Sequence, residues 1–190
     1  MEEVFQKVYR HPLLTEADLK TLADAHEPVE VPKGTVLLRE GKIANEYYIL
    51  QSGIARAYVY DYNGNEITTE FFSENEVVIS TSSLFQRIPS QENIQAVTDC
   101  ILWKLNFEVF QPLFHSMPGF REWGRLWFTT QLFFIKQRSL DMIRETATAR
   151  YLKLLQEKPE IIQYVPLKQI ASYLGVTDTS LSRIRKEISA

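Results

Sequence analysis

Hydroxyl and basic side chains recur on one side of a short segment close to the C-terminus. On the side opposite to its apolar residues, this segment carries Thr179, Ser180, Ser182, Arg183 and Lys186. Hydroxyl and ammonium groups suit contacts with phosphate. The guanidinium of arginine suits a purine edge in the major groove, because its fork donates two parallel hydrogen bonds. These residue types in this order favour DNA recognition.

Two apolar stripes predict the pair of helices that would present these side chains. One stripe consists of Leu167, Ile170, Ala171 and Leu174, and the other of Leu181, Ile184 and Ile188, at helical spacing. Gly175 is expected to end the first helix, because glycine adopts the left-handed conformation without strain. Thr177 or Asp178 is expected to cap the second helix. Residues 166–188 therefore predict a helix-turn-helix in which Lys168 and Thr177 join the DNA contacts, although a helical hairpin with another role needs the same stripes and glycine.

The charge of the chain is distributed unevenly between its two ends. The net charge is −3, but residues 146–190 hold seven Lys/Arg against four acidic residues, and residues 1–145 hold 14 against 20. An acidic body with a basic C-terminal part is expected where one end meets phosphate. A difference of this size can also arise by chance, so it supports the motif without proving it.

Composition describes a folded protein without an export or membrane signal. Among the 190 residues, 45% are hydrophobic and 24% charged, which is ordinary for a globular chain of one large or two small domains. The first residues lack the pattern of a signal peptide, and no apolar run approaches a membrane span. The single Cys100 excludes an internal disulfide. We expect a cytoplasmic protein with no membrane partner.

The N-terminal two thirds of the chain predict strands after a helical start. Residues 2–25 read as helical, with Thr15 as a cap, and residues 29–105 alternate short β-rich runs with turn signals. The runs 54–60 and 66–72 predict a hairpin, in which Asn63-Gly64 would form a type I′ turn. Several short strands in one stretch suggest a small antiparallel barrel or roll. We place this domain at residues 1–118.

A long aromatic helix is predicted to follow. A short helix at 107–115 precedes one of about residues 120–145, which is apolar on nearly every side and must therefore be covered on several sides. It is either a central core helix or, as we favour, a dimer helix at residues 119–145, because a single helix-turn-helix reads only one half-site. The predicted interface residues are Trp123, Leu126, Trp127, Phe133, Phe134 and Leu140. A helix at 147–157, with Tyr151, Leu154 and Leu155 inward, opens the DNA-binding domain at residues 146–190.

This order of parts resembles the Crp/Fnr family of bacterial transcription regulators from end to end. Pro32-Lys-Gly34-Thr-Val-Leu-Leu-Arg-Glu-Gly41 and Tyr48-Ile-Leu-Gln-Ser-Gly53 match its glycine-punctuated strands, and Leu181-Ser-Arg183-Ile-Arg matches its recognition helix. The resemblance implies an α+β fold with a β-roll similar to a cyclic-nucleotide-binding domain. It implies that Thr177 and Ser180 contact phosphates and that Arg183 reads a guanine. The implied partners are double-stranded DNA with a palindromic operator, a twin subunit and RNA polymerase.

Two departures from the family pattern alter these expectations. The Gly-Glu pair that holds the ribose becomes Ile79-Ser80, and the Arg that holds the cyclic phosphate becomes Ser90, with Arg87 as an alternative, displaced anchor. A phosphate buried without a cation is costly, so cAMP and cGMP are not expected to bind. The candidate effector pocket, for an unknown small molecule or none, consists of Ser80, Ser82, Ser83, Arg87, Ser90 and Gln91. The chain also ends two residues after Ile188, without the β-hairpin that commonly follows, so affinity should depend more on the helix itself.

Enzymatic and metal chemistry find little support in the residues. A metal-dependent β-roll enzyme needs about three histidines and a carboxylate on its strands. His11, His26 and His115 all lie outside the predicted sheet, and Cys100 sits in an apolar strand. We expect no catalytic activity, metal or cofactor. The alternative function is a regulatory module that binds an effector or a protein through the roll instead of DNA.

Overall fold

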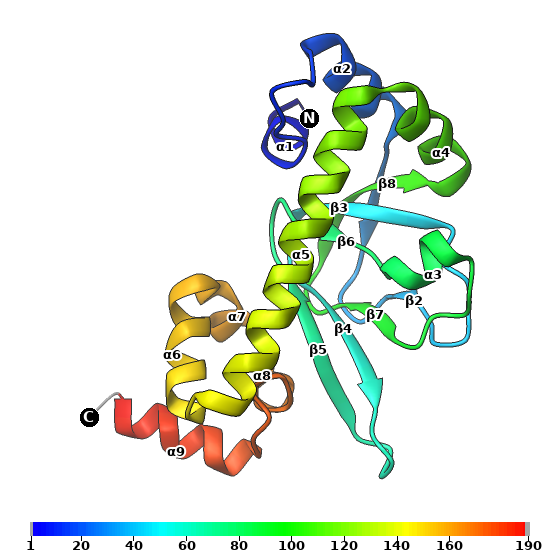
Figure 1. The fold of residues 1–190 in the computed structure, drawn as a ribbon. Coiled ribbons are helices and arrows are strands. Elements are labelled where there is room, and N and C mark those ends of the chain that lie inside the picture. Colours follow the sequence, from blue (N-terminus) through cyan, green and yellow to red (C-terminus); the bar gives the residue numbers. More distant parts are fainter. Residues whose placement is uncertain (1, 189–190) are drawn as a thin grey trace.

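The computed structural model describes residues 2–188 and has the predicted α+β fold (Figure 1). Two helices, α1 (Glu2–Val8) and α2 (Glu16–Ala25), precede a roll of two four-stranded antiparallel sheets. The predicted helical start is interrupted between them, and Thr15 caps α2 in a reciprocal capping box with Asp18. The expectation that no β-hairpin follows Ile188 concerns residues 189–190, which lie outside the described residues.

The two sheets enclose one apolar core. The first sheet has the order β1 (Glu27–Val31), β8 (Cys100–Asn106), β3 (Glu46–Ser52) and β6 (Val77–Val78), and the second β2 (Val36–Leu38), β7 (Asn93–Ala96), β4 (Ala55–Tyr60) and β5 (Glu66–Phe72). Leu50, Leu102, Ala55 and Ile94 are buried between them. The opposite face of the first sheet is covered by α1, α2, α4 (Phe107–Ser116) and the start of the long helix α5 (Pro118–Arg144), which meet it through an aromatic cluster.

The β4–β5 hairpin forms as predicted, but its turn differs. Tyr60 pairs with Glu66, so five residues form the connection instead of a two-residue type I′ turn. The N–H of Gly64 donates to the carbonyl of Asp61, and only Gly64 of the pair has a positive φ, of 80°. The Asp61 carboxylate accepts the N–H groups of Asn63 and Asn65. This side chain therefore organises a wider loop that the dipeptide alone did not reveal.

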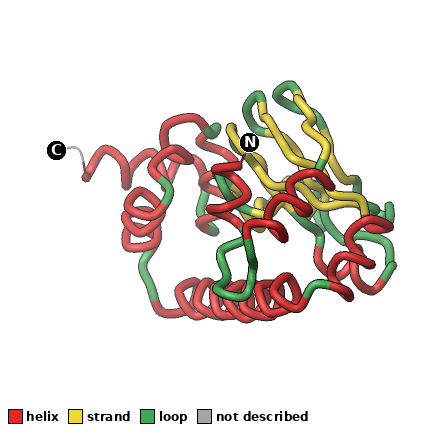
Figure 2. Tube along the Cα trace, turned by 90° about the horizontal axis from the view of Figure 1, so that it is seen from above, coloured by secondary structure: helices red, strands yellow, loops and turns green. Residues whose placement is uncertain are grey.

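The long helix connects the roll to four C-terminal helices. These are α6 (Ala147–Glu157), α7 (Pro159–Tyr164), α8 (Leu167–Leu174) and α9 (Asp178–Ile188), and a short helix, α3 (Thr81–Gln86), interrupts the strands of the roll. Figure 2 shows α5 running along one side of the strands, with the C-terminal helices grouped at one end. None of the helices in residues 2–188 has the length and apolar character needed to cross a membrane.

Candidate functional site

The turn between α8 and α9 forms as the sequence predicts. Gly175 is left-handed, with a φ of 70°, and its N–H reaches the carbonyl of Ser172 at 3.2 Å. The N–H of Val176 donates to the carbonyl of Ala171, which closes the C-terminus of α8. The Thr177 hydroxyl accepts the N–H of Ser180 at 3.2 Å and so caps the first turn of α9. The predicted pair of helices, joined by a left-handed glycine turn, is therefore present.

The apolar stripes of the two helices meet in one core, with two corrections. Ile170, Ala171, Leu174, Leu181 and Ile184 are buried, and Leu167 is half-buried. Ile188 is 39% exposed, although it was predicted to be buried, because α9 extends past the helices that cover its first turns (Figure 1). Leu155, predicted to point inward from α6, is 37% exposed, since Tyr151 and Leu154 take the buried face.

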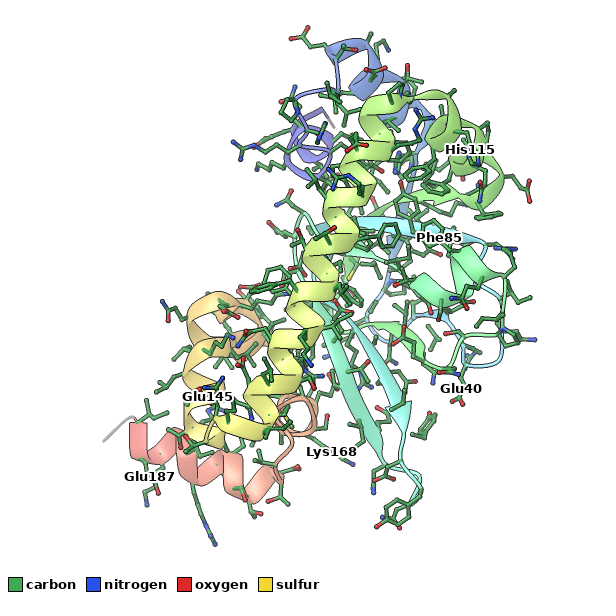
Figure 3. All side chains as sticks on the ribbon, in the orientation of Figure 1. Glu40, Phe85, His115, Glu145, Lys168 and Glu187 are labelled. Atoms are coloured by element: carbon green, nitrogen blue, oxygen red, sulfur yellow. The ribbon has the colours of Figure 1, made fainter. Side chains whose placement is uncertain are left out.

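The outer side of α9 carries side chains that were predicted to contact DNA. Thr179, Ser182, Arg183 and Lys186 are exposed, and Ser180 is half-buried. The Thr177 hydroxyl lies 3.0 Å from that of Thr179 and 2.9 Å from that of Ser180, so the three form a hydroxyl cluster at the N-terminus of the helix. Lys168 is exposed on α8 and points away from the core (Figure 3). The structure thus brings the seven candidate residues to one end of the molecule.

Part of the positive charge of this region has a structural use. The Arg150 guanidinium donates to the carbonyls of Leu174, at 2.9 Å, and Glu145, at 2.6 Å. Lys153 pairs with Asp141 at 2.6 Å, and this hydrogen bond lowers the pKa of the Asp141 carboxyl. The basic excess counted in the sequence is therefore not all available to phosphate, and the exposed Lys168, Arg183 and Lys186 become the relevant cations.

The C-terminal helices α6–α9 pack on the roll, a contact that the sequence did not reveal. Ile54, Phe71 and Val97 of the roll belong to the same buried cluster as the core of α6–α9. The ammonium of Lys158 donates to the carbonyl of Phe71 at 2.8 Å and to Glu76 at 2.6 Å. The N–H of Thr68 on strand β5 donates to the hydroxyl of Ser172 on α8 at 3.1 Å. Strand β5 therefore helps to fix the position of α8 and the helices packed on it.

The apolar residues of the long helix, which the sequence placed on nearly every side, differ in how far the chain covers them. Trp123 is buried within the chain, where its indole N–H donates to the carbonyl of Val8, and Trp127 packs on the same cluster. Leu126 is 44% and Phe133 63% exposed, and Leu140 is half-buried. Phe134 is also exposed. Of the residues predicted for the interface, Trp123 is thus buried within the chain, and the Leu126/Phe133/Leu140 stripe is largely uncovered by it.

Ser80, Ser83 and Ser90, which we call the serine cassette, form hydrogen bonds within the roll. Ser80 and Ser90 are buried, and their hydroxyls lie 3.2 Å apart. Ser83 is also buried; it accepts the N–H of Ala44 and donates to the carbonyl of Ile88. Of the other predicted effector residues, Ser82 and Gln91 are exposed. Ser80 and Ser90, which align with the family's ribose-binding and phosphate-binding residues, therefore lie within hydrogen-bonding distance of each other.

The Arg87 guanidinium, the alternative anchor for an anion, makes its contacts away from the serine pair. Arg87 adopts a left-handed conformation at the end of α3, and its guanidinium donates to the carbonyl of Ala44 at 2.6 Å and to Asn45. The same group lies 4.3 Å from the centre of the Phe107 ring. These contacts hold Arg87 against α4 and the β2–β3 connection instead of the serine pair.

Two carboxylates beside the cassette were missed from the sequence. Glu92 accepts a hydrogen bond from Thr69 at 3.4 Å; burial raises the pKa of its carboxyl, against the hydrogen bonds from Ser80 and Thr69 that lower it. The strand register places Glu70 on the same face of β5 as Phe72, which is in the core of the roll. Solvent reaches part of Glu70, but desolvation by the surrounding protein raises the pKa of its carboxyl to about 7. Only the pairing of β4, β5 and β7 brings these residues together.

The histidines and the acidic residues do not assemble into a metal centre in the part of the chain that the structure describes. His26 is buried, and its ring nitrogens contact the carbonyl of Leu22 at 2.6 Å and the hydroxyl of Tyr9 at 3.0 Å. The Tyr9 hydroxyl lies 2.6 Å from that of Tyr47. This cluster fastens α1 and α2 to strand β3.

Comparison with known proteins supports the fold assignment. Residues 28–117 match the family model of the cyclic nucleotide-binding domain. The chain is 28% identical over 118 residues, 62% of its length, to a cAMP-dependent protein kinase regulatory subunit from Colletotrichum orbiculare, of which it spans only 29%. The roll therefore has the fold of a cyclic nucleotide-binding domain.

Solved structures extend the likeness to the C-terminal helices. The c-di-GMP responsive global regulator CLP of Xanthomonas campestris has a TM-score of 0.73 at 18% identity, over 92% of each chain. A protein described as a Crp/Fnr family transcriptional regulator from Eubacterium rectale has a TM-score of 0.72 at 20% identity, over 94% of this chain and 86% of that one. The catabolite activator protein of Thermus thermophilus has a TM-score of 0.60 at 18% identity, over 96% and 86%. The whole chain therefore has a Crp/Fnr-like fold.

Proposed function

We propose that this protein is a homodimeric, sequence-specific DNA-binding transcription regulator of the Crp/Fnr type. The observation that carries the proposal is the outer side of α9, where Arg183, Ser182 and Lys186 are exposed on a helix capped by Thr177. A capped, exposed helix of this kind can enter the major groove with its N-terminal residues toward the bases. The Crp/Fnr-like fold of the whole chain supports the same function.

The uncovered stripe of α5 supports the proposed dimer. Leu126, Phe133 and Leu140 are spaced by seven residues, so a twin helix can pack along them as in a coiled coil. Exposed apolar residues that form a continuous stripe commonly mark an interface between proteins. Two reading helices related by a two-fold axis would read two half-sites of a palindromic operator.

We further propose that DNA binding does not require cAMP or cGMP. Ser80 and Ser90 offer a cyclic nucleotide neither the carboxylate for its ribose nor the cation for its phosphate. The Glu92 carboxylate lies beside them and would repel an anion. The Arg87 guanidinium is held elsewhere by Ala44 and Asn45. The chemistry of the cassette therefore opposes an anionic ligand.

Affinity measurements on matched variants test the DNA-binding role. If Arg183 reads a guanine, Arg183→Ala should weaken specific binding by about 1–3 kcal/mol and relax the preference at one base of each half-site. If Lys186 contacts phosphate, Lys186→Ala should weaken specific and random DNA alike and reduce the salt dependence by about one ion. Lys42→Ala, which removes an exposed cation from the roll, is the matched control and should change neither.

Two outcomes would contradict the proposal. An equal loss on specific and random DNA for Arg183→Ala would exclude base reading by this residue. Retention on a DNA column that does not fall as salt is added would exclude binding through phosphates and favour a regulatory module that acts on another partner.

A further inference from the structure

A groove lies between α3 and the N-terminal half of α5, apart from the reading helices and the serine cassette. Its volume is about 740 Å³, within the range of sites that hold small molecules. Three phenyl rings line it: Phe85 on α3, Phe114 on α4 and Phe128 on α5. The Phe85 and Phe128 rings meet edge to face, with their centres 5.1 Å apart. An apolar, ring-shaped body would therefore find aromatic partners from three helices.

The apolar wall of the groove depends on a glycine in α5. A Cβ added to Gly124 would lie 2.6 Å from Cε2 of Phe114, so only glycine lets this ring rest against the helix. Behind the rings, a void of about 20 Å³ is lined by apolar atoms and bordered also by Trp127. Phe85, Phe114 and Phe128 thus border both the groove and this void, and the inner side of the groove is aromatic.

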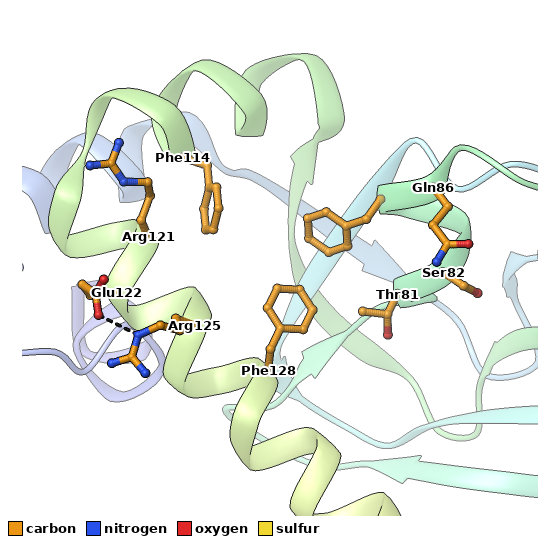
Figure 4. A pocket seen from close by; sticks show the side chains of 9 residues that line it. Thr81, Ser82, Gln86, Phe114, Arg121, Glu122, Arg125 and Phe128 are labelled. Carbon is orange, nitrogen blue, oxygen red and sulfur yellow. Dashed lines mark hydrogen bonds and ion pairs between the residues drawn. The ribbon is translucent and has the colours of Figure 1, made fainter.

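The α5 side of the groove carries two arginines. Arg121 and Arg125 lie one helical turn apart, and Figure 4 shows their guanidinium groups turned away from the Phe128 ring. Arg121 donates to the carbonyl of His115 at 2.6 Å, and Arg125 pairs with Glu122 at 2.8 Å. Both partners of that pair are exposed, and exposed ion pairs add little stability. The Arg125 guanidinium can therefore turn over the groove at small cost, and the two arginines outnumber the single carboxylate, Glu122.

We propose that this groove binds an aromatic monocarboxylate. The ring would lie against Phe114 and Phe128, and the carboxylate would accept hydrogen bonds from Arg121 or Arg125 at the rim. The opposite wall is formed by α3, where Ser82 is exposed and lines the groove. Ser82 was predicted to belong to the effector pocket, but the structure places it on this separate site. The inference does not depend on whether the protein binds DNA.

Calorimetry with 2-naphthoate tests the site on the full chain. The neutral alcohol 2-naphthalenemethanol has the same rings without the charge, and its affinity should be about tenfold lower if an arginine holds the carboxylate. The double variant Arg121→Gln/Arg125→Gln should weaken naphthoate to the level of the alcohol. Ser82→Phe, which fills the groove from an exposed position, should abolish binding of both compounds. Arg144→Gln, at the other end of α5, is the matched control and should leave both affinities unchanged.

Three results would overturn the proposal. Equal affinity for naphthoate and the alcohol would show that the groove does not recognise the carboxylate. Unchanged binding by Ser82→Phe would place the compounds elsewhere on the protein. Absence of any heat at millimolar naphthoate would exclude the site.

Discussion

The buried His26 should make the protein sensitive to mild acid. Desolvation lowers the pKa of this imidazole from 6.5 to about 4, and the hydrogen bond to the carbonyl of Leu22 only partly opposes it. The Tyr9 hydroxyl occupies the other ring nitrogen, so a second proton would disturb the Tyr9–Tyr47 pair as well. The folded protein therefore keeps the ring neutral at pH values at which the unfolded chain protonates it.

The size and the direction of the effect follow from the two pKa values. Above pH 6.5 neither state binds the proton, so His26 makes stability independent of pH there. As the pH falls from 6.5 toward 4, only the unfolded chain gains the proton, and the free energy of unfolding decreases. At about 1.4 kcal/mol for each pKa unit, the loss is about 2 kcal/mol at pH 5 and about 3 kcal/mol once the folded state also protonates.

Urea unfolding at pH 7.5 and pH 5.0 measures this loss. His26→Gln keeps a polar amide in the cavity but cannot titrate, so the difference between its two unfolding free energies should be smaller than in the parent by about 2 kcal/mol. Comparison within each protein cancels any general destabilisation by the substitution. His115→Gln, exposed on α4, is the matched control. The reasoning would be refuted if His115→Gln reduced the difference between the two unfolding free energies as much as His26→Gln, or if His26→Gln did not reduce it.

Three further predictions concern the interface, the cassette and the turn. Phe133→Asp should convert a dimer of twice the 22.1 kDa chain into monomer or aggregate in native mass spectrometry, whereas a monodisperse monomer of the parent that still binds DNA would contradict the dimer. Calorimetry should detect no binding of cAMP or cGMP at micromolar concentration, because the lost ribose and phosphate contacts at Ser80 and Ser90 together correspond to roughly two to four powers of ten in affinity; a micromolar site would refute this account. Gly175→Ala should lower the free energy of unfolding by roughly 1–2 kcal/mol through left-handed backbone strain; the nearby Met142 methyl group can move aside and adds little. An unchanged urea unfolding midpoint would be inconsistent with this turn.

Local patterns predicted α8, α9 and the turn between them well, because each of their features lies within a few residues of the next. The stripe of Ile170, Ala171 and Leu174, the left-handed Gly175 and the Thr177 cap all follow from short-range rules of helix geometry. The hairpin was predicted for the same reason. Its turn was wrong because the carboxylate of Asp61 organises a longer loop, and this contest between two turn types is decided by hydrogen bonds that a dipeptide rule does not include.

Features that depend on tertiary pairing could not be predicted. Nothing in the local sequence places Glu92 beside Ser80, or Lys158 on the carbonyl of Phe71, because these contacts join segments far apart in the chain. The same limit applied to α5, where periodicity showed apolar residues on nearly every side but not that Trp123 packs against the N-terminal helices of its own chain. Which face of an apolar helix remains open depends on what its own chain covers.

Selection of bound sequences from random double-stranded DNA tests the central claim most directly. The account predicts enrichment of a palindrome with two equivalent half-sites, obtained without added cyclic nucleotide. The same selection with Arg183→Ala should lose the preference at one base of each half-site, while Lys42→Ala should return the parent palindrome. No enriched sequence for the parent protein, or an unaltered palindrome for Arg183→Ala, would contradict the assignment of α9 as the element that reads DNA.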